Sequence, residues 1–178
     1  MIKQMTTPRF IFVCCAILLI GASRLLPHPF NFTPVLAMGL FAGAMLSSFS
    51  MALLIPLAAM FLSDIFLGFH NTMWGTYAAT AVSSFLGYAI RNKLNIVSVS
   101  GTSVASAILF FLVSNFAVWA MPTPELNYPQ SFAGLIAGYE SALPFFRATL
   151  FSNLLYTGLL FGAFHLAAEL RPNLKNIR

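Results

Sequence analysis

The 178-residue chain is 59% hydrophobic, has only 7% charged residues and carries a formal net charge of +5. A soluble domain has about 25% charged residues, so this composition excludes a soluble globular protein and indicates an integral membrane protein. The apolar runs are continuous and about 17–25 residues long, which favours spanning helices over the short alternating strands of a membrane barrel. We therefore expect a single all-α membrane domain over residues 1–178.

Six membrane-spanning helices are predicted along the chain, separated by prolines or short polar turns. The last span begins with a proline, which suits the first turn of a helix. A segment before it, residues 131–143, is too short and polar to span and is predicted to be an interfacial or re-entrant helix. The six predicted spans are residues 10–26, 35–48, 51–67, 72–90, 102–120 and 144–168.

The first apolar run follows Lys3 and Arg9 and in this resembles a signal peptide. Arg24 lies close to any cleavage position, so we expect the run to be retained as a helix. Cys14 and Cys15 are adjacent within it. Neighbours on a helix point in different directions, so the two thiols are poor candidates for a metal pair, and two cysteines cannot make a disulfide framework.

Glycine pairs with GxxxG spacing occur in two predicted spans. Gly39 and Gly43 belong to the second span, and Gly158 and Gly162 belong to the sixth. Small residues at this spacing allow helix backbones to approach closely. Both pairs are therefore predicted to lie in helix–helix contacts.

The basic residues predict the orientation. Six spans place both termini on one side, and if that side is the cytoplasm, the positive-inside rule is obeyed. Nucleic-acid binding is not indicated, because the basic residues are spread over short segments without aromatic platforms. We expect a multi-pass protein of the bacterial inner membrane whose cationic side contacts the lipid bilayer. The basic residues expected inside are Lys3, Arg9, Arg91, Lys93, Arg171, Lys175 and Arg178, and those expected near outer helix ends are Arg24 and Arg147.

Polar and aromatic side chains gather on the predicted outer side of the membrane. This asymmetry predicts a ligand pocket open to the outside. The candidate binding residues are Arg24, His28, Asn31, Asp64, His70, Asn71, Trp74, Tyr77, Tyr139, Arg147 and Asn153, and Glu125, Asn127, Tyr128, Glu140 and Tyr156 lie in the same outer segments.

Asp64 is the most informative of these residues, because a carboxylate inside an apolar run is costly to bury. It could cap a helix end, while Trp74 could belong to an interfacial aromatic belt. Alternatively, Asp64 and Arg147 could neutralise each other across the bundle. In the functional interpretation, one or both contact a ligand, for which arginine offers fork-like recognition of an anionic group.

His28 lies between Pro27 and Pro29 and must be presented by a stiff loop. It is either an ordinary loop histidine or a donor to the ligand, and it could also ligate a metal within a bound cofactor. The chain lacks Walker, GxGxxG, HExxH, CxxC and GxSxG motifs, and its four acidic residues leave little for acid–base chemistry. We therefore expect neither an enzyme nor a complete ATP-driven pump, and no intrinsic cofactor.

Three stretches resemble a family of small bacterial transport proteins that is similar to the S components of energy-coupling-factor (ECF) transporters. The stretches are RLLPHPFNFTPVLAMGLFAGA, LSDIFLGFH and FFRATLFSNLLYTGLLFGAF, and the resemblance extends from about Arg24 to Leu170. It implies an S-component-like bundle of six helices with cytoplasmic termini. It also implies capture of a vitamin or metal ion near the outer face, with energy supplied by a membrane scaffold subunit and two ATPases.

Within the S components, the chain resembles the solitary cobalamin group. That group has a proline-flanked histidine, an aspartate ending the third helix and an arginine opening the sixth, which correspond to His28, Asp64 and Arg147. The resemblance implies cobalamin, or a related corrinoid, as substrate. The group's cobalt-ligating cysteine near the start of helix four is missing, and Met73 or His70 is nearest. The first helix also lacks the alanine-xxx-alanine pattern used to dock on a shared scaffold, which favours a solitary protein.

A second class of function stays open: a non-transport membrane protein whose polar outer loops bind a partner protein. The transport hypothesis requires a concave outer pocket lined by the candidate residues. The interaction hypothesis requires closed loops and an exposed apolar or aromatic patch.

Overall fold

The computed structural model describes residues 7–123 and 126–174. Within these residues the chain forms six α-helices and two short 3-10 helices, and no strand, so the all-α prediction is confirmed. In chain order the elements are α2 (Pro8–Ala22), η1 (Ser23–Leu25), α3 (Val35–Met45), α4 (Phe49–Leu67), α5 (Met73–Ile90), α6 (Ile96–Ala120), α7 (Phe132–Leu170) and η2 (Pro172–Leu174).

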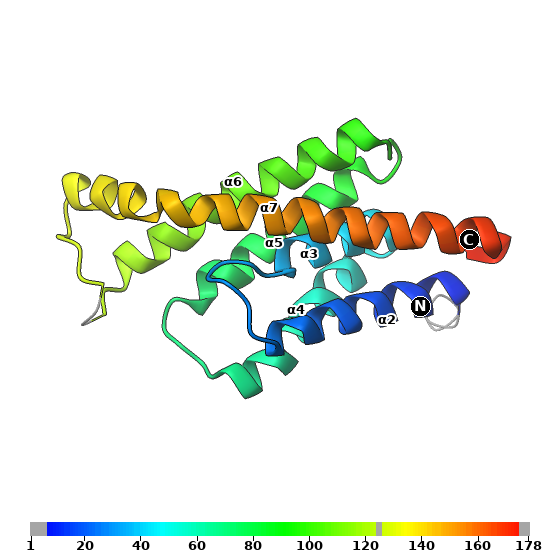
Figure 1. Ribbon diagram of the computed structural model, residues 1–178, viewed down its shortest axis with the longest axis horizontal. Helices are drawn as coiled ribbons and strands as arrows, with labels where there is room; N and C mark the ends of the chain where they lie inside the picture. Colours follow the sequence, from blue (N-terminus) through cyan, green and yellow to red (C-terminus); the bar gives the residue numbers. More distant parts are fainter. Residues whose placement is uncertain (1–6, 124–125, 175–178) are drawn as a thin grey trace.

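The connections between the helices gather at two ends of the bundle (Figure 1). One end, here called the three-loop end, carries the α2–α3, α4–α5 and α6–α7 connections. The opposite end, here called the terminal end, carries the α3–α4 and α5–α6 connections, the start of α2, and the end of α7 with η2. The first described helix thus begins, and the last one ends, at the same end of the bundle.

Four helical segments are long and apolar enough to cross a membrane: Pro8–Leu25, Phe49–Leu67, Ile96–Ala120 and Phe132–Leu170. Helix α3 is apolar but has only 11 residues. At about 1.5 Å of rise per residue it is about 16 Å long, roughly half the thickness of a bilayer core. The second predicted span, residues 35–48, is thus shorter than expected and does not reach across a membrane by itself.

Helix α7 differs most from its prediction. The segment predicted as a separate short helix, residues 131–143, is continuous with the last span: Ser131 caps α7, and Pro144 lies inside this one helix of 39 residues. The α6–α7 hairpin consequently extends beyond the other helices at the three-loop end (Figure 1). A proline is tolerated inside such a helix because neighbouring groups can satisfy the carbonyl that it leaves unpaired.

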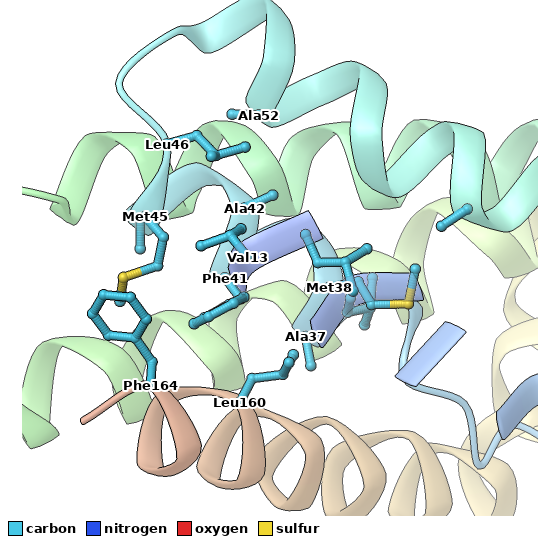
Figure 2. Close-up of a cluster of buried hydrophobic side chains, with 14 of the residues drawn as sticks. Val13, Ala37, Met38, Phe41, Ala42, Met45, Leu46, Ala52, Leu160 and Phe164 are labelled. Atoms are coloured by element: carbon cyan, nitrogen blue, oxygen red, sulfur yellow. The ribbon is translucent and has the colours of Figure 1, made fainter. Parts of the chain in front are cut away.

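Helix α3 lies at the centre of the protein, and all eleven of its residues are buried. Its Phe41 ring contacts the rings of Phe161 and Phe164 on α7, with centroid distances of 5.3 and 6.1 Å. Figure 2 shows α3 side chains between Leu160 and Phe164 of α7 on one side and the α4 ribbon on the other. An apolar helix buried on every face is typical of the core of a helical bundle.

Helices α3 and α5 pack with their backbones in contact, and three glycines make this possible. A Cβ atom on Gly39 would lie 2.7 Å from the carbonyl oxygen of Thr80. A Cβ on Gly43 or on Gly87 would collide with backbone atoms of the opposite helix. The first glycine pair therefore lies in a close helix contact, as predicted.

The second glycine pair does not lie in a close contact with another helix of the chain. Nothing lies within 4 Å of a Cβ placed on Gly158 or Gly162, and both residues are exposed on α7. The prediction that this pair packs against another helix of the chain is wrong, because it faces away from the bundle.

Candidate functional site

Three polar side chains form a compact cluster near the three-loop end, where η1, α4 and α5 meet. Arg24 Nη2 lies 2.7 Å from Asp64 Oδ1, and the Tyr77 hydroxyl donates to Asp64 Oδ2 at 2.7 Å. The side chains of Arg24 and Asp64 are 11% and 6% exposed. Both carboxylate oxygens therefore accept a hydrogen bond, which is what burial of this charge requires.

The Arg24 guanidinium is held by more than the ion pair. Its Nη1 donates to the Met60 carbonyl oxygen at 3.1 Å and to the Ser63 hydroxyl. Its Nε is buried and has no hydrogen-bond partner. A buried donor without a partner costs about 1–3 kcal/mol, so this nitrogen marks a position where a water or a ligand oxygen would be stabilised.

Asp64 is therefore paired with Arg24 and not with Arg147, the partner considered from the sequence. Arg147 is exposed on α7 and makes no ion pair with the residues that the structure describes. Arg24 lies in η1, directly after α2, whereas Arg147 lies in the interior of α7. The choice between them depends on the packing of α2 against α4, which spacing along the chain does not reveal.

Four of the other candidates lie in the connections at the three-loop end and are exposed: His28, Asn31, His70 and Asn71. His28 Nδ1 lies 3.0 Å from the carbonyl oxygen of Pro29, and His70 Nδ1 lies 3.0 Å from the Thr72 hydroxyl. Asn31 adopts a left-handed backbone conformation with φ of 60°. Short contacts of this kind hold the two imidazoles close to their own loops, with their outer edges open to solvent.

Trp74 and Tyr139 tie the ends of helices together. The Trp74 indole nitrogen donates to Met121 Sδ at 3.0 Å, linking the start of α5 to the end of α6. The Tyr139 hydroxyl donates to the Leu112 carbonyl oxygen at 2.8 Å, linking α7 to α6. Both side chains therefore have a structural contact that the sequence did not indicate.

Asn153 belongs to a buried polar contact between α6 and α7, well below the loops. Its amide nitrogen donates to the Ser103 carbonyl oxygen at 2.7 Å, and Ser103 and Thr157 hydroxyls lie 3.2 Å apart. The Asn153 side-chain oxygen is buried and has no partner. Sequence reasoning found Asn153 but missed Ser103 and Thr157, although hydroxyl residues inside predicted spans were visible.

A second buried polar contact links α5 to α3 and α6. The Ser83 hydroxyl donates to the Leu36 carbonyl oxygen at 2.7 Å and lies 3.1 Å from the Ser106 hydroxyl. These residues were also missed. Hydroxyl groups that bond across helices are common in membrane bundles, because small polar side chains allow both close packing and a hydrogen bond.

The candidate residues thus divide into a buried cluster (Arg24, Asp64, Tyr77), exposed loop positions and contacts of the α6–α7 hairpin. Within residues 7–123 and 126–174, no group of three His, Cys, Asp or Glu side chains is arranged to hold a metal ion. Glu125, one of the predicted outer acids, lies outside the described residues.

Among the cavities of the described residues, three with volumes of about 710, 140 and 120 Å³ are lined by residues other than the candidates. The 710 Å³ cavity runs along α2 and the end of α7, and the 120 Å³ cavity lies within the α6–α7 hairpin. The intermediate one lies at the terminal end, between Arg9 and Arg91.

Together these features define an all-helical protein with four helices able to span a membrane and a buried ion pair near one end of the bundle. The chain belongs to DUF6580, a family of unknown function, which matches residues 4–174. No curated protein and no solved structure matches the chain.

Proposed function

We propose that this protein is the substrate-binding membrane component of an uptake system for a small vitamin-type molecule. The protein would be a multi-pass component of the bacterial inner membrane, with the terminal end in the cytoplasm and the three-loop end outside. The segments Arg9, Arg91–Lys93 and Arg171 would then lie inside, in agreement with the positive-inside rule.

The observation that carries the proposal is the buried Arg24–Asp64–Tyr77 cluster with its unpaired Arg24 Nε. Ionisable groups within spanning segments are costly and are retained mainly at substrate or ion sites. Arg24 and Asp64 lie near the ends of the elements that lead into the loops carrying the exposed candidates His28 and His70. A polar ligand held by the loops would contact this charged cluster and accept a hydrogen bond from the unpaired Arg24 Nε.

The exposed arginine on α7 supplies the second element of the proposed site. Arg147 has no carboxylate partner in the described part of the chain, so its five N–H donors are free for an anionic or amide group of a ligand. We propose that the ligand lies between the α7 guanidinium and the loops, with no catalytic step on this chain.

Cobalamin or a related corrinoid is the first substrate to test, following the resemblance to the solitary cobalamin group. The exposed His28 ring would contact the cobalt from its open side. Energy for transport would come from an ECF scaffold subunit and ATPases, or the protein would act alone.

Substitution of Arg147 by methionine tests the proposal in cells. The residue is exposed and without an ion pair in the described structure, so Arg147→Met should leave folding intact and reduce cobalamin-dependent growth or uptake at least tenfold. Lys93→Gln, which removes the same charge at the terminal end, is the matched control and should behave as wild type. Equal uptake by all three proteins would refute a role for the three-loop end.

A protein-binding function is the second candidate, because several aromatic side chains near the three-loop end are exposed. Phe30 is 84%, Phe66 78% and Phe69 61% exposed. Exposed apolar groups of this kind mark interaction surfaces as well as lipid contacts. Replacing Phe30 and Phe69 by serine should leave uptake unchanged under the transport proposal, whereas loss of a co-purifying protein with unchanged ligand binding would favour the alternative.

A further inference from the structure

A small hollow at the terminal end is lined by two arginines and no acidic side chain. It lies between the start of α2, the α3–α4 connection and the end of α5, and has a volume of about 140 Å³. A water molecule takes about 30 Å³ in the liquid, so the hollow has room for a group the size of a phosphate. Its lining residues are Arg9, Ala44, Met45, Leu46, Ser47, Arg91 and Asn92.

Arg9 forms one wall and is only 9% exposed. Its Nε donates to the Met45 carbonyl oxygen at 2.8 Å, its Nη2 contacts Met45 Sδ at 3.5 Å, and the guanidinium lies 5.1 Å from the centre of the Phe164 ring. A guanidinium has five N–H donors. Two of them are used, one of them on a weakly accepting sulfur, so three donors remain.

Arg91 forms the opposite wall. Its Nη1 donates to the Ser47 carbonyl oxygen at 3.1 Å, and the guanidinium stacks 3.8 Å from the centre of the Tyr88 ring. Four of its five donors are therefore unused. The exposed Asn92 amide, which makes no hydrogen bond to the residues that the structure describes, completes the rim.

Capping of α3 explains part of this arrangement but not all of it. Positive side chains are favourable near the carbonyl end of a helix, and Arg9 bonds the last carbonyl of α3. One cation would suffice for that purpose. Two cations facing one hollow repel each other, and a largely buried charge without a counter-charge is costly.

The acidic side chains of the described residues do not supply the missing negative charge. The chain has four acids in all. Asp64 is paired with Arg24, Glu169 lies 3.2 Å from His165, and Glu140 is in the half of α7 near the three-loop end. The fourth, Glu125, lies outside the described residues. No acidic side chain of the described residues therefore lines the hollow or pairs with Arg9 or Arg91, and a bound anion would supply the counter-charge.

We propose that this hollow is a binding site for a phosphate group, held between Arg9 and Arg91 with Asn92 at the rim. Planar guanidinium groups match phosphate oxygens with two parallel hydrogen bonds. The phosphate would come either from the headgroup of an anionic lipid or from a soluble phosphate. The site is separate from the proposed ligand site at the three-loop end.

Lipid and soluble phosphate can be distinguished with the purified full chain in a neutral detergent. One arm measures retention of phosphatidylglycerol against phosphatidylcholine by native mass spectrometry. The other measures the melting temperature with inorganic phosphate against chloride at equal ionic strength. Preferential retention of phosphatidylglycerol alone identifies a headgroup, and stabilisation by inorganic phosphate alone identifies a soluble phosphate. No preference in either arm overturns the proposal.

Two variants and one control connect the effect to the hollow. Arg91→Gln should weaken the preferred probe roughly tenfold, as expected for loss of a charge-assisted pair. Lys93→Gln is the control, because it changes the net charge by the same amount two residues away and does not line the hollow. An equal loss in the control would show only a diffuse surface charge effect and would refute the site.

Asn92→Asp keeps the proposal testable if Arg91→Gln fails to fold. The residue is exposed and makes no hydrogen bond that the fold needs. The new carboxylate would offset one of the two positive charges and occupy donors of the arginines, and it should weaken the probe at least as much as Arg91→Gln. Undiminished binding in a folded Asn92→Asp protein would contradict the proposal.

Discussion

Substitution of Gly43 by alanine should destabilise the protein, because the added methyl has no room between α3 and α5. The new Cβ would lie 2.7 Å from the Tyr88 amide nitrogen and 3.0 Å from the Gly87 carbonyl carbon, and would collide with the Ser84 carbonyl oxygen. Ordinary contacts begin at 3.4 Å. The amide nitrogen alone would have to move by 3.4 − 2.7 = 0.7 Å, and the nearer oxygen by more.

Such a movement cannot stay local, because α3 is buried on every side. Overpacking of a dense core costs about 1–3 kcal/mol, and we expect the free energy of unfolding to fall by that amount. The assay is unfolding of the purified protein in mixed micelles. Gly162→Ala is the matched control, since its Cβ would meet nothing within 4 Å; it should be at least as stable as the wild type, because alanine is the better helix former by up to about 1 kcal/mol. Equal stability of the two variants would refute the close α3–α5 contact.

Three further predictions concern the cluster and the topology. Asp64→Asn should lower the free energy of unfolding by about 3–5 kcal/mol, because it leaves the charge of Arg24 without a partner. Addition of Arg24→Met should recover most of that loss, and an undiminished loss in the double variant would contradict the Arg24–Asp64 ion pair. Tyr77→Phe should cost about 1.5–3 kcal/mol, the usual contribution of a hydrogen bond to a charged group, and unchanged melting would show that the hydroxyl is not needed. A cysteine introduced at the exposed Asn127 should react with an impermeant maleimide only from outside the cell, and labelling only from the cytoplasm would invert the proposed orientation.

Much of the fold was predictable because hydrophobic runs and charge bias are local properties. The last apolar run and the segment before it show where prediction from these local signals fails. Pro144 is a strong signal for a helix start in solution, yet here it lies within α7. In α3, the apolar run ends at Leu46 and the helix ends at Met45. The sequence could not show that this short apolar helix is buried within the bundle instead of crossing a bilayer.

The residues of the candidate site could be predicted from the sequence, but the contacts between them could not. The two GxxxG pairs have the same spacing, and only the packing of α3 on α5 tells Gly43 from Gly162. In the same way, the sequence suggested Arg147 as the partner of Asp64, whereas the packing of η1 against α4 brings Arg24 to it. Pairing depends on which helix faces are neighbours, and this is a property of the whole bundle.

Direct ligand binding tests the central claim, that the three-loop end holds a small vitamin-type molecule. The measurement is equilibrium binding of cobalamin to the purified full chain, followed by visible absorption, with a panel of water-soluble vitamins beside it. The account predicts that wild type and Lys93→Gln bind one of these compounds equally and that Arg147→Met binds it at least tenfold more weakly. If cobalamin is the ligand, His28→Ala should also abolish the spectral shift. A folded wild-type protein that binds none of the compounds, or an Arg147→Met protein that binds as the wild type does, would contradict the claim.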